Sequence, residues 1–206
     1  MTNKTTLSKD NSISRSDNAF IKNTSYICIT GIILTLLSLL FDKSLLVFVE
    51  YLKNNLLITI FSIITYLGEI KEFIILAIIL TIIFFIFKKP VLAFWMSIGL
   101  SSAAGFILKY IISRPRPFEY LHTTSIVQTS FSSFPSGHAL AVFCILPFVA
   151  HEFPRGKIFF WSIAVLVGLS RIYLQVHYLS DVVAGAFIGY IIGSVLLYLS
   201  KKHGWR

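Results

Sequence analysis

The 206-residue chain has few charged residues, few carboxylates and little cysteine. Charged side chains make up 13% of it, and only 9 residues are aspartate or glutamate. So little charge excludes an ordinary soluble domain. The carboxylates form no cluster and no Cys/His set is present, so the sequence lacks the ligands of a typical metal site. Cys28 and Cys144 both lie in apolar segments, where a thiol usually serves as a small packing residue.

Apolar side chains dominate the composition. They account for 56% of the residues, and aromatic side chains account for 15%. Such a composition is typical of an integral membrane protein. The formal net charge of +9 suggests a nucleic-acid partner at first sight, but the basic residues are scattered in short groups beside apolar segments. Membrane topology explains that distribution better, and we expect no nucleic acid to bind.

Six apolar segments are interpreted as membrane-spanning helices. One longer apolar region is divided by the polar break 68–72. Its first part, 44–67, is interpreted as an interfacial or re-entrant helical stretch and its second part as a span, although an arrangement with seven spans stays open. The prediction is an all-α, polytopic membrane helix bundle with six transmembrane helices, at 26–41, 73–87, 91–112, 139–150, 158–174 and 182–199.

The basic residues indicate the topology. If both termini are cytoplasmic, six spans place most lysines and arginines on the cytoplasmic side, as the positive-inside rule requires. Residues 1–25 are rich in Ser, Thr, Asn and Lys and are predicted to be a disordered cytoplasmic leader. The six-span domain would then cover 26–200, followed by a cytoplasmic tail at 201–206. No small-residue cleavage pattern follows the first span, so we expect it to remain as an anchor.

Three polar clusters end apolar segments on the opposite, extracytoplasmic side, where six spans would bring them together. The first begins with Lys109, on the last turns of its span. Pro115 and Pro117 then stop the helix and set the direction of Arg116. Two cations thus approach from different backbone segments, as clamping of a phosphoryl group requires. Arg114, whose long side chain can extend to lipid headgroups, is left outside the expected set.

The second cluster is Pro135-Ser136-Gly137-His138, directly before an apolar helix. Ser136 is suited to cap the helix, and Gly137 permits a close approach of the backbone to a ligand. The free N–H groups of the first helical turn form an anion site, and His138 is held beside it.

The third cluster places Arg171 at the end of one span, His177 in a short connection and Asp181 at the head of the next span. Asp181 can fix the tautomer of His177 and raise the nucleophilicity of the free ring nitrogen. Such a pair on its own is more often structural than catalytic. Here it shares a membrane face with the two other clusters, which indicates an active site.

Together the clusters resemble the three-part signature of the type 2 phosphatidic acid phosphatase family, lipid phosphate phosphatases that are related to vanadium haloperoxidases. The resemblance spans about residues 42–199. The matching motifs are Lys109-x6-Arg116-Pro117, Pro135-Ser136-Gly137-His138 and Ser170-Arg171-x5-His177-x3-Asp181.

The resemblance implies a phosphatase that needs no metal and no other cofactor. His177 would attack phosphorus to give a phosphohistidine, and Asp181 would orient it. His138 would protonate the leaving oxygen and later deprotonate the hydrolytic water. The phosphoryl oxygens would be held by Lys109, Arg116, Ser136, Gly137 and Arg171.

A phosphate site at the lipid–water boundary suits an amphiphile whose apolar part stays in the bilayer. Small bacterial members that the chain resembles act on undecaprenyl diphosphate, phosphatidylglycerol phosphate, phosphatidic acid or lipid A phosphates. The first two are favoured, and a bacterial inner membrane is the expected location. Two alternatives are a lipid phosphotransferase that uses the same residues, and a non-enzymatic transporter or scaffold on the same fold.

Overall fold

The computed structural model describes residues 3–125, 127 and 132–205, and the regular structure in this part of the chain is entirely helical. A 3-10 turn, Pro154–Gly156, separates two of the helices. The α-helices are α1 (Asn3–Leu52), α2 (Asn55–Tyr66), α3 (Ile70–Ile86), α4 (Val91–Ile112), α5 (Pro117–Tyr120), α6 (Gly137–Glu152), α7 (Lys157–Tyr173) and α8 (Leu179–His203).

The predicted spans coincide with α1, α3, α4, α6, α7 and α8, which confirms a helical membrane protein. Within the described residues, four helical segments have the length and composition to cross a membrane: Arg15–Leu52, Val91–Tyr120, Pro154–Tyr173 and Leu179–His203. At 17 and 16 residues, α3 and α6 are about 25 Å long and fall slightly short of a typical hydrocarbon core. The number of six spans therefore stays a prediction.

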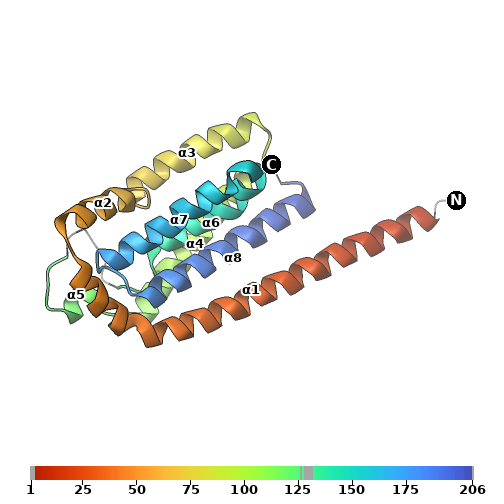
Figure 1. Ribbon diagram of the computed structural model, residues 1–206. Helices are drawn as coiled ribbons and strands as arrows, with labels where there is room; N and C mark the ends of the chain where they lie inside the picture. Colours follow the sequence, from red (N-terminus) through yellow and green to blue (C-terminus); the bar gives the residue numbers. More distant parts are fainter. Residues whose placement is uncertain (1–2, 126, 128–131, 206) are drawn as a thin grey trace.

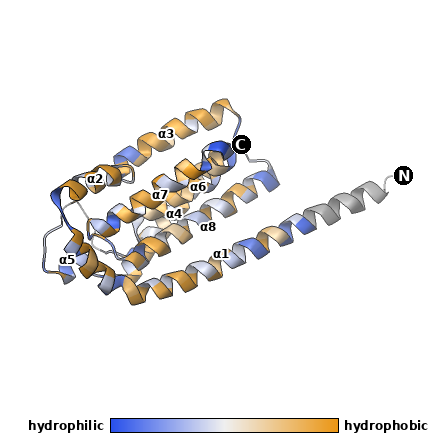
Figure 2. Cartoon of the chain, in the orientation of Figure 1, coloured by the Kyte–Doolittle hydropathy of each residue, from blue (hydrophilic) through white to orange (hydrophobic). Residues whose placement is uncertain are grey.

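The helices pack around a central pair, α6 and α8 (Figure 1). Helices α4 and α7 flank α6, α1 runs along α8, and α3 lies on the outside of the bundle. Hydrophobic residues make up much of the helices (Figure 2), and many of their side chains are exposed. Leu40, Phe85 and Ile158, for example, are 74%, 77% and 74% exposed. Apolar surface of this extent is compatible with a lipid environment and would be unfavourable in water.

Glycines let α6 and α8 pack main chain against main chain. Gly185, Gly189 and Gly193 follow one another at four-residue spacing and so lie on one face of α8. A Cβ atom added at Gly189 would lie 2.4 Å from the carbonyl oxygen of Leu140, which is too close for any side chain. Small residues at such spacing allow membrane helices to approach closely. The start of α6 is thereby held against the start of α8.

Helix α1 begins at Asn3, so residues 3–25 are helical in place of the predicted disorder. Proline and glycine are absent before position 31, so nothing in the local sequence ends the helix. The helix is also anchored on α8, because Lys202 Nζ and the Tyr198 hydroxyl both donate hydrogen bonds to Asp17, the first at 2.5 Å. The Phe20 ring stacks on Tyr198 with centroids 3.7 Å apart. The predicted leader therefore continues the first span.

The stretch 44–67 is helical with one break. Helix α1 runs on to Leu52 and bends across the end of the bundle, and α2 then leads back toward α3 (Figure 1). The Asn54 side chain accepts a hydrogen bond from the backbone N–H of Leu57 at 2.9 Å and so caps α2. The Tyr173 hydroxyl joins the break to α7, because it donates to the carbonyl of Leu52 at 3.1 Å.

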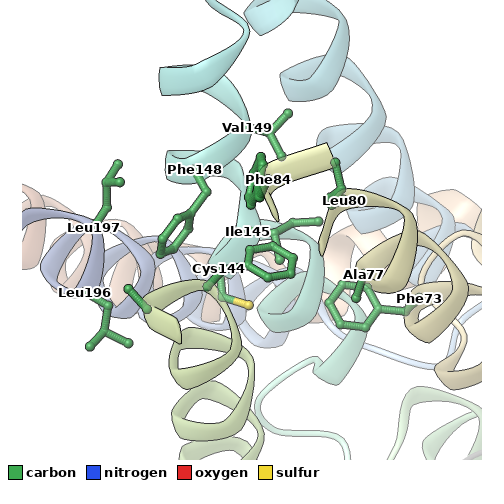
Figure 3. Packing of buried hydrophobic residues seen from close by; sticks show 12 residues of the cluster. Phe73, Ala77, Leu80, Phe84, Cys144, Ile145, Phe148, Val149, Leu196 and Leu197 are labelled. Atoms are coloured by element: carbon green, nitrogen blue, oxygen red, sulfur yellow. The ribbon is translucent and has the colours of Figure 1, made fainter. Parts of the chain in front are cut away.

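An apolar core fills the bundle where α3, α4, α6 and α8 meet (Figure 3). The rings of Phe84 and Phe148 both meet Phe94 edge to face, with centroids 5.3 Å and 5.7 Å apart. Cys144 is a buried member of this core, in keeping with a packing role. Polar groups gather at the opposite end of the same helices.

Candidate active site

Hydrogen bonds join the three polar clusters at one end of the bundle. The backbone N–H of Ser136, just before α6, donates to the carbonyl of Asp181 in the first turn of α8 at 2.9 Å. The guanidinium of Arg116 donates to the carbonyl of Val176 at 2.6 Å, one residue before His177. Segments that lie up to 60 residues apart thereby form one site. The structure brings together the residues that the sequence singled out.

Two of the expected cations converge on a single oxygen atom. The carbonyl of Ser132 accepts hydrogen bonds from Lys109 Nζ at 2.8 Å and from Arg116 Nη2 at 3.0 Å. The chain can turn back here because Ser113, directly after the last residue of α4, has a left-handed conformation with φ 44°. Two cations aimed at one acceptor are also what an oxygen of a phosphoryl group requires.

The His177–Asp181 pair is buried. Nδ1 of His177 lies 3.6 Å from Oδ2 of Asp181, which is longer than a hydrogen bond, and among the described residues Nδ1 has no other partner. A small rotation of the imidazole would close the gap. Burial lowers the pKa of His177 well below its ordinary value, and nearby cations, Arg171 foremost, act in the same direction. The ring is therefore neutral at neutral pH, the state that a nucleophile needs.

Arg114 holds the carboxylate of Asp181 from the other side. Its Nη1 donates to Asp181 Oδ1 at 2.6 Å, and its Nη2 donates to Asp42 Oδ2 at 2.8 Å. The guanidinium also lies 4.0 Å from the centre of the Tyr178 ring. Arg114 was left outside the expected set, and Asp42 had no local signal because it lies 72 residues away along the chain. Both belong to the support of the His177–Asp181 pair.

Ser136 and Gly137 form the start of α6 as the sequence indicated. The buried Ser136 hydroxyl accepts a hydrogen bond from the backbone N–H of Ala139 at 3.4 Å. A Cβ atom added at Gly137 would meet nothing within 4 Å, so the protein leaves space beside the first turn. An N-terminal turn that faces open space is suited to receive an anion.

The end of α2 and the turn between α2 and α3 form a further wall of the site, which the sequence did not predict. Arg171 Nη1 donates to the Thr65 hydroxyl at 2.6 Å, and Nε2 of His138 lies 3.3 Å from Oε1 of Glu69. The hydrogen bond from His138 lowers the pKa of the Glu69 carboxyl below its ordinary value, against the opposing effect of partial burial. In the sequence only the polar break at 68–72 indicated this turn. We interpreted that break as a boundary between helices and not as part of the site.

The site therefore combines the three expected cations with two imidazoles, and its carboxylates are paired with these imidazoles or with Arg114. Nε of Arg171 is buried and has no hydrogen-bond partner in the described part of the chain. The described residues contain no group of three or more His, Cys, Asp or Glu side chains that could hold a metal ion. An unsatisfied guanidinium donor beside two other cations favours an anionic ligand with several oxygens.

Residues 90–205 match the sequence profile of the PAP2 superfamily. The chain belongs to this superfamily. The matched region contains all three polar clusters and excludes Asp42 and Glu69, which contact them from α1 and from the α2–α3 turn.

Named relatives within the PAP2 superfamily are phosphatases. The chain is 35% identical over 106 residues to phosphatidylglycerophosphatase B of Bacillus subtilis, covering 46% of this chain and 48% of that protein. It is 31% identical over 113 residues to an undecaprenyl-diphosphatase of Sulfolobus acidocaldarius, covering 52% of each. The chain thus spans about half the length of the curated relatives that it matches.

Two solved PAP2 structures resemble most of the bundle. The crystal structure of a transmembrane PAP2-type phosphatidylglycerolphosphate phosphatase from Bacillus subtilis has a TM-score of 0.74 at 26% identity and covers 87% of this chain and 96% of that one. LpxE of Aquifex aeolicus has a TM-score of 0.68 at 30% identity, over 77% and 95% of the two chains. Both similarities extend beyond the region that the family profile matches.

Proposed function

We propose that the protein is an integral membrane lipid phosphate phosphatase. The observation that carries the proposal is the convergence of Lys109, Arg116 and Arg171 with two histidines at one end of an apolar helix bundle. Such a set can bind a phosphate ester and supply both a nucleophile and an acid. The phosphatase names of the relatives support the same activity.

The first chemical step is transfer of the phosphoryl group to His177. Because Nδ1 faces Asp181, Nε2 is the nitrogen that attacks phosphorus. The P–O bond to the lipid breaks as the P–N bond forms, and His138 donates a proton to the leaving oxygen. The three cations stabilise the charge on the phosphoryl oxygens, together with Ser136 and the backbone N–H of Gly137.

The second step is hydrolysis of the phosphohistidine. His138, now neutral, takes a proton from water as the water oxygen attacks phosphorus. The P–N bond breaks, and inorganic phosphate leaves with His177 restored. Each histidine thereby returns to its starting protonation state, and neither step calls for a metal ion.

The substrate that we favour is undecaprenyl diphosphate or phosphatidylglycerol phosphate. The polar site lies at one end of helices whose outer faces are apolar, so a lipid can place its phosphate in the site while its hydrocarbon stays in the bilayer. Relatives named for these substrates support the choice. Removal of the terminal phosphate would leave the lipid anchored in the membrane.

We further propose six spans, cytoplasmic termini and an extracytoplasmic site in a bacterial inner membrane. Segments assigned to the cytoplasm by their basic residues do meet at one end of the bundle, opposite the site. There Lys89 pairs with Glu152 at 2.6 Å, and Lys202 pairs with Asp17 at 2.5 Å. The positive-inside rule then orients this end toward the cytoplasm.

Phosphate release by the purified protein tests the proposal. The protein in detergent, with EDTA present, is given undecaprenyl diphosphate, phosphatidylglycerol phosphate or phosphatidic acid in parallel. We expect release by the wild-type protein and a loss of at least about 10³-fold in His177→Ala. Circular dichroism of both proteins checks that the variant is folded, and the ranking of the three lipids identifies the substrate class.

Three results would contradict parts of the proposal. Equal release by His177→Ala would remove the phosphohistidine mechanism. Release abolished by EDTA and restored by a divalent cation would show that a metal takes part. A phosphorylated lipid product in place of free phosphate would make the protein a phosphotransferase.

A further inference from the structure

The end of α2 and the α2–α3 turn close the site with three separate contacts. Thr65 accepts a hydrogen bond from Arg171, and Oε1 of Glu69 lies 3.8 Å from the same Arg171 Nη1. Gly68 faces His138 so closely that an added Cβ would lie 2.6 Å from the imidazole Cδ2. The turn therefore contacts the acid–base histidine and a phosphate-binding cation at once.

Glu69 is placed to determine which nitrogen of His138 reacts. Nε2 lies 3.3 Å from the carboxylate, so in the neutral ring Nε2 carries the hydrogen and donates it to Glu69. Nδ1 is then the nitrogen that can exchange a proton with the substrate. Without the carboxylate, nothing else described in contact with Nε2 would fix this tautomer.

We propose that Glu69 is the positioning residue of His138, and that the site contains two histidine–carboxylate pairs, one for each chemical role. The inference rests on the proposed phosphatase function. In the first step Nδ1–H of protonated His138 passes its proton to the leaving oxygen. In the second step Nδ1 takes a proton from water. The Nε2–H group keeps its hydrogen bond to Glu69 in both steps.

The charges around His138 explain why a carboxylate is needed. Burial disfavours a protonated His138 most, and the positive charges of Arg171 on α7 and of Arg116 in the segment after α4 act in the same direction. Glu69 supplies the opposing negative charge from the α2–α3 turn. The proton donor would otherwise be weak beside two cations.

The leaving group provides the sharpest test. An alkyl lipid phosphate needs a proton on its leaving oxygen, whereas p-nitrophenyl phosphate releases a stable phenolate and needs none. For Glu69→Gln we expect kcat/KM to fall about 10- to 100-fold with the lipid phosphate. With p-nitrophenyl phosphate we expect a change of less than about 3-fold, because kcat/KM reports the phosphoryl transfer step and not the later hydrolysis.

Glu72→Gln is the matched control, because it removes the same charge from an exposed position three residues further along. We expect it to behave as the wild-type protein with both substrates. The alkaline limb of the kcat/KM profile with the lipid should move to lower pH in Glu69→Gln and stay in place in Glu72→Gln, since only Glu69 stabilises the protonated imidazole.

A double variant separates positioning from a general structural effect. Because Glu69 acts through His138, Glu69→Gln should add no loss to that of His138→Ala with the lipid substrate. Independent, multiplying losses would overturn the inference, as would equal losses with the two leaving groups. If the wild-type protein releases phosphate and Glu69→Gln matches Glu72→Gln, only the role of Glu69 fails; if the wild-type protein releases none, the proposed function itself fails.

Discussion

The two histidines of the site are supported in different ways. His177 and its carboxylate, Asp181, are 3% and 0% exposed at the side chain and lie four residues apart. His138 and Glu69 are 15% and 31% exposed and lie 69 residues apart. Asp181 is further held by Arg114, whereas Glu69 sits on a turn between two helices. His177, the proposed nucleophile, thus lies close in sequence to its carboxylate, and Arg114 holds that carboxylate in place. The position of His138, the proposed acid–base residue, relative to Glu69 depends on how α2 and α3 pack.

The difference suits the two chemical roles proposed for these histidines. A nucleophile acts on a phosphorus atom in a fixed position, so a buried and fully supported imidazole is an advantage. In the proposed mechanism the acid–base residue must meet a leaving oxygen that belongs to a lipid and later a water molecule. A partly exposed imidazole at the wall of the site gives both of them access.

Among the substitutions that test this difference between the two histidines, removal of Arg114 should have the largest effect. In Arg114→Ala, the buried carboxylates of Asp42 and Asp181 lose the cation between them, and we expect a loss of stability of about 3–5 kcal/mol. Thermal unfolding in detergent measures it, with the exposed Arg155→Ala as the control. Phosphate release should fall as well, because Asp181 is no longer held toward His177. An unchanged unfolding temperature would show that the two carboxylates do not need Arg114.

Gly68→Ala should disturb His138 and leave the His177–Asp181 pair in place. Its Cβ would lie 2.6 Å from His138 Cδ2 and 3.0 Å from Val167 Cγ1, so the imidazole or the turn has to shift and the contact between His138 and Glu69 changes. A displacement of this size should lower kcat/KM with a lipid phosphate by about 10-fold. Gly99→Ala is the control, since its Cβ meets nothing within 4 Å. Equal activity of the two variants would show that the ring tolerates the added methyl group.

The smallest expected effect is a shift in the pH dependence of kcat/KM. Burial and the surrounding cations lower the pKa of His177 well below its ordinary value, so its protonation should limit kcat/KM only at pH values well below 6.5. Lys109→Met removes one of those cations, the pKa of His177 rises, and the acid limb moves to higher pH. The exposed Lys157→Met, which lies outside the site, should leave the limb in place. A limb that stays in place in Lys109→Met would show that Lys109 does not act on His177.

Sequence reasoning succeeded where the signal was local. Helix α4 has the predicted bounds 91–112 because Pro90 precedes it and the proline-rich segment after Ser113 prevents its continuation. The leader is the counterexample. Its Ser, Thr and Asn content favours disorder, but Asp17 and Phe20 contact α8 from the far end of the chain, and composition carries no information on such contacts.

The residues of the candidate site were likewise predicted only where they lie close together in the sequence. The spacing of His177 and Asp181 is visible in the sequence, since four residues place both groups near one helix start. The partners Glu69 and Asp42 were not predicted, because they reach the clusters from 69 and 72 residues away. Arg114 is the intermediate case, since it stands inside a motif but its role depends on Asp42, which only the packing of α1 brings near.

The main-chain contact between α6 and α8 limits the positions at which this protein can accept substitutions. A Cβ at Gly193 would lie 2.1 Å from the carbonyl of Cys144, deep in the apolar half, and one at Gly185 would lie 2.6 Å from that of Ser136, at the site. No flexible side chain lies between the helices at these points to absorb a displacement. Adaptation to a thicker or differently composed bilayer is therefore easiest on outward faces such as that of Phe85, and a substitution in this contact would alter catalysis from within the membrane.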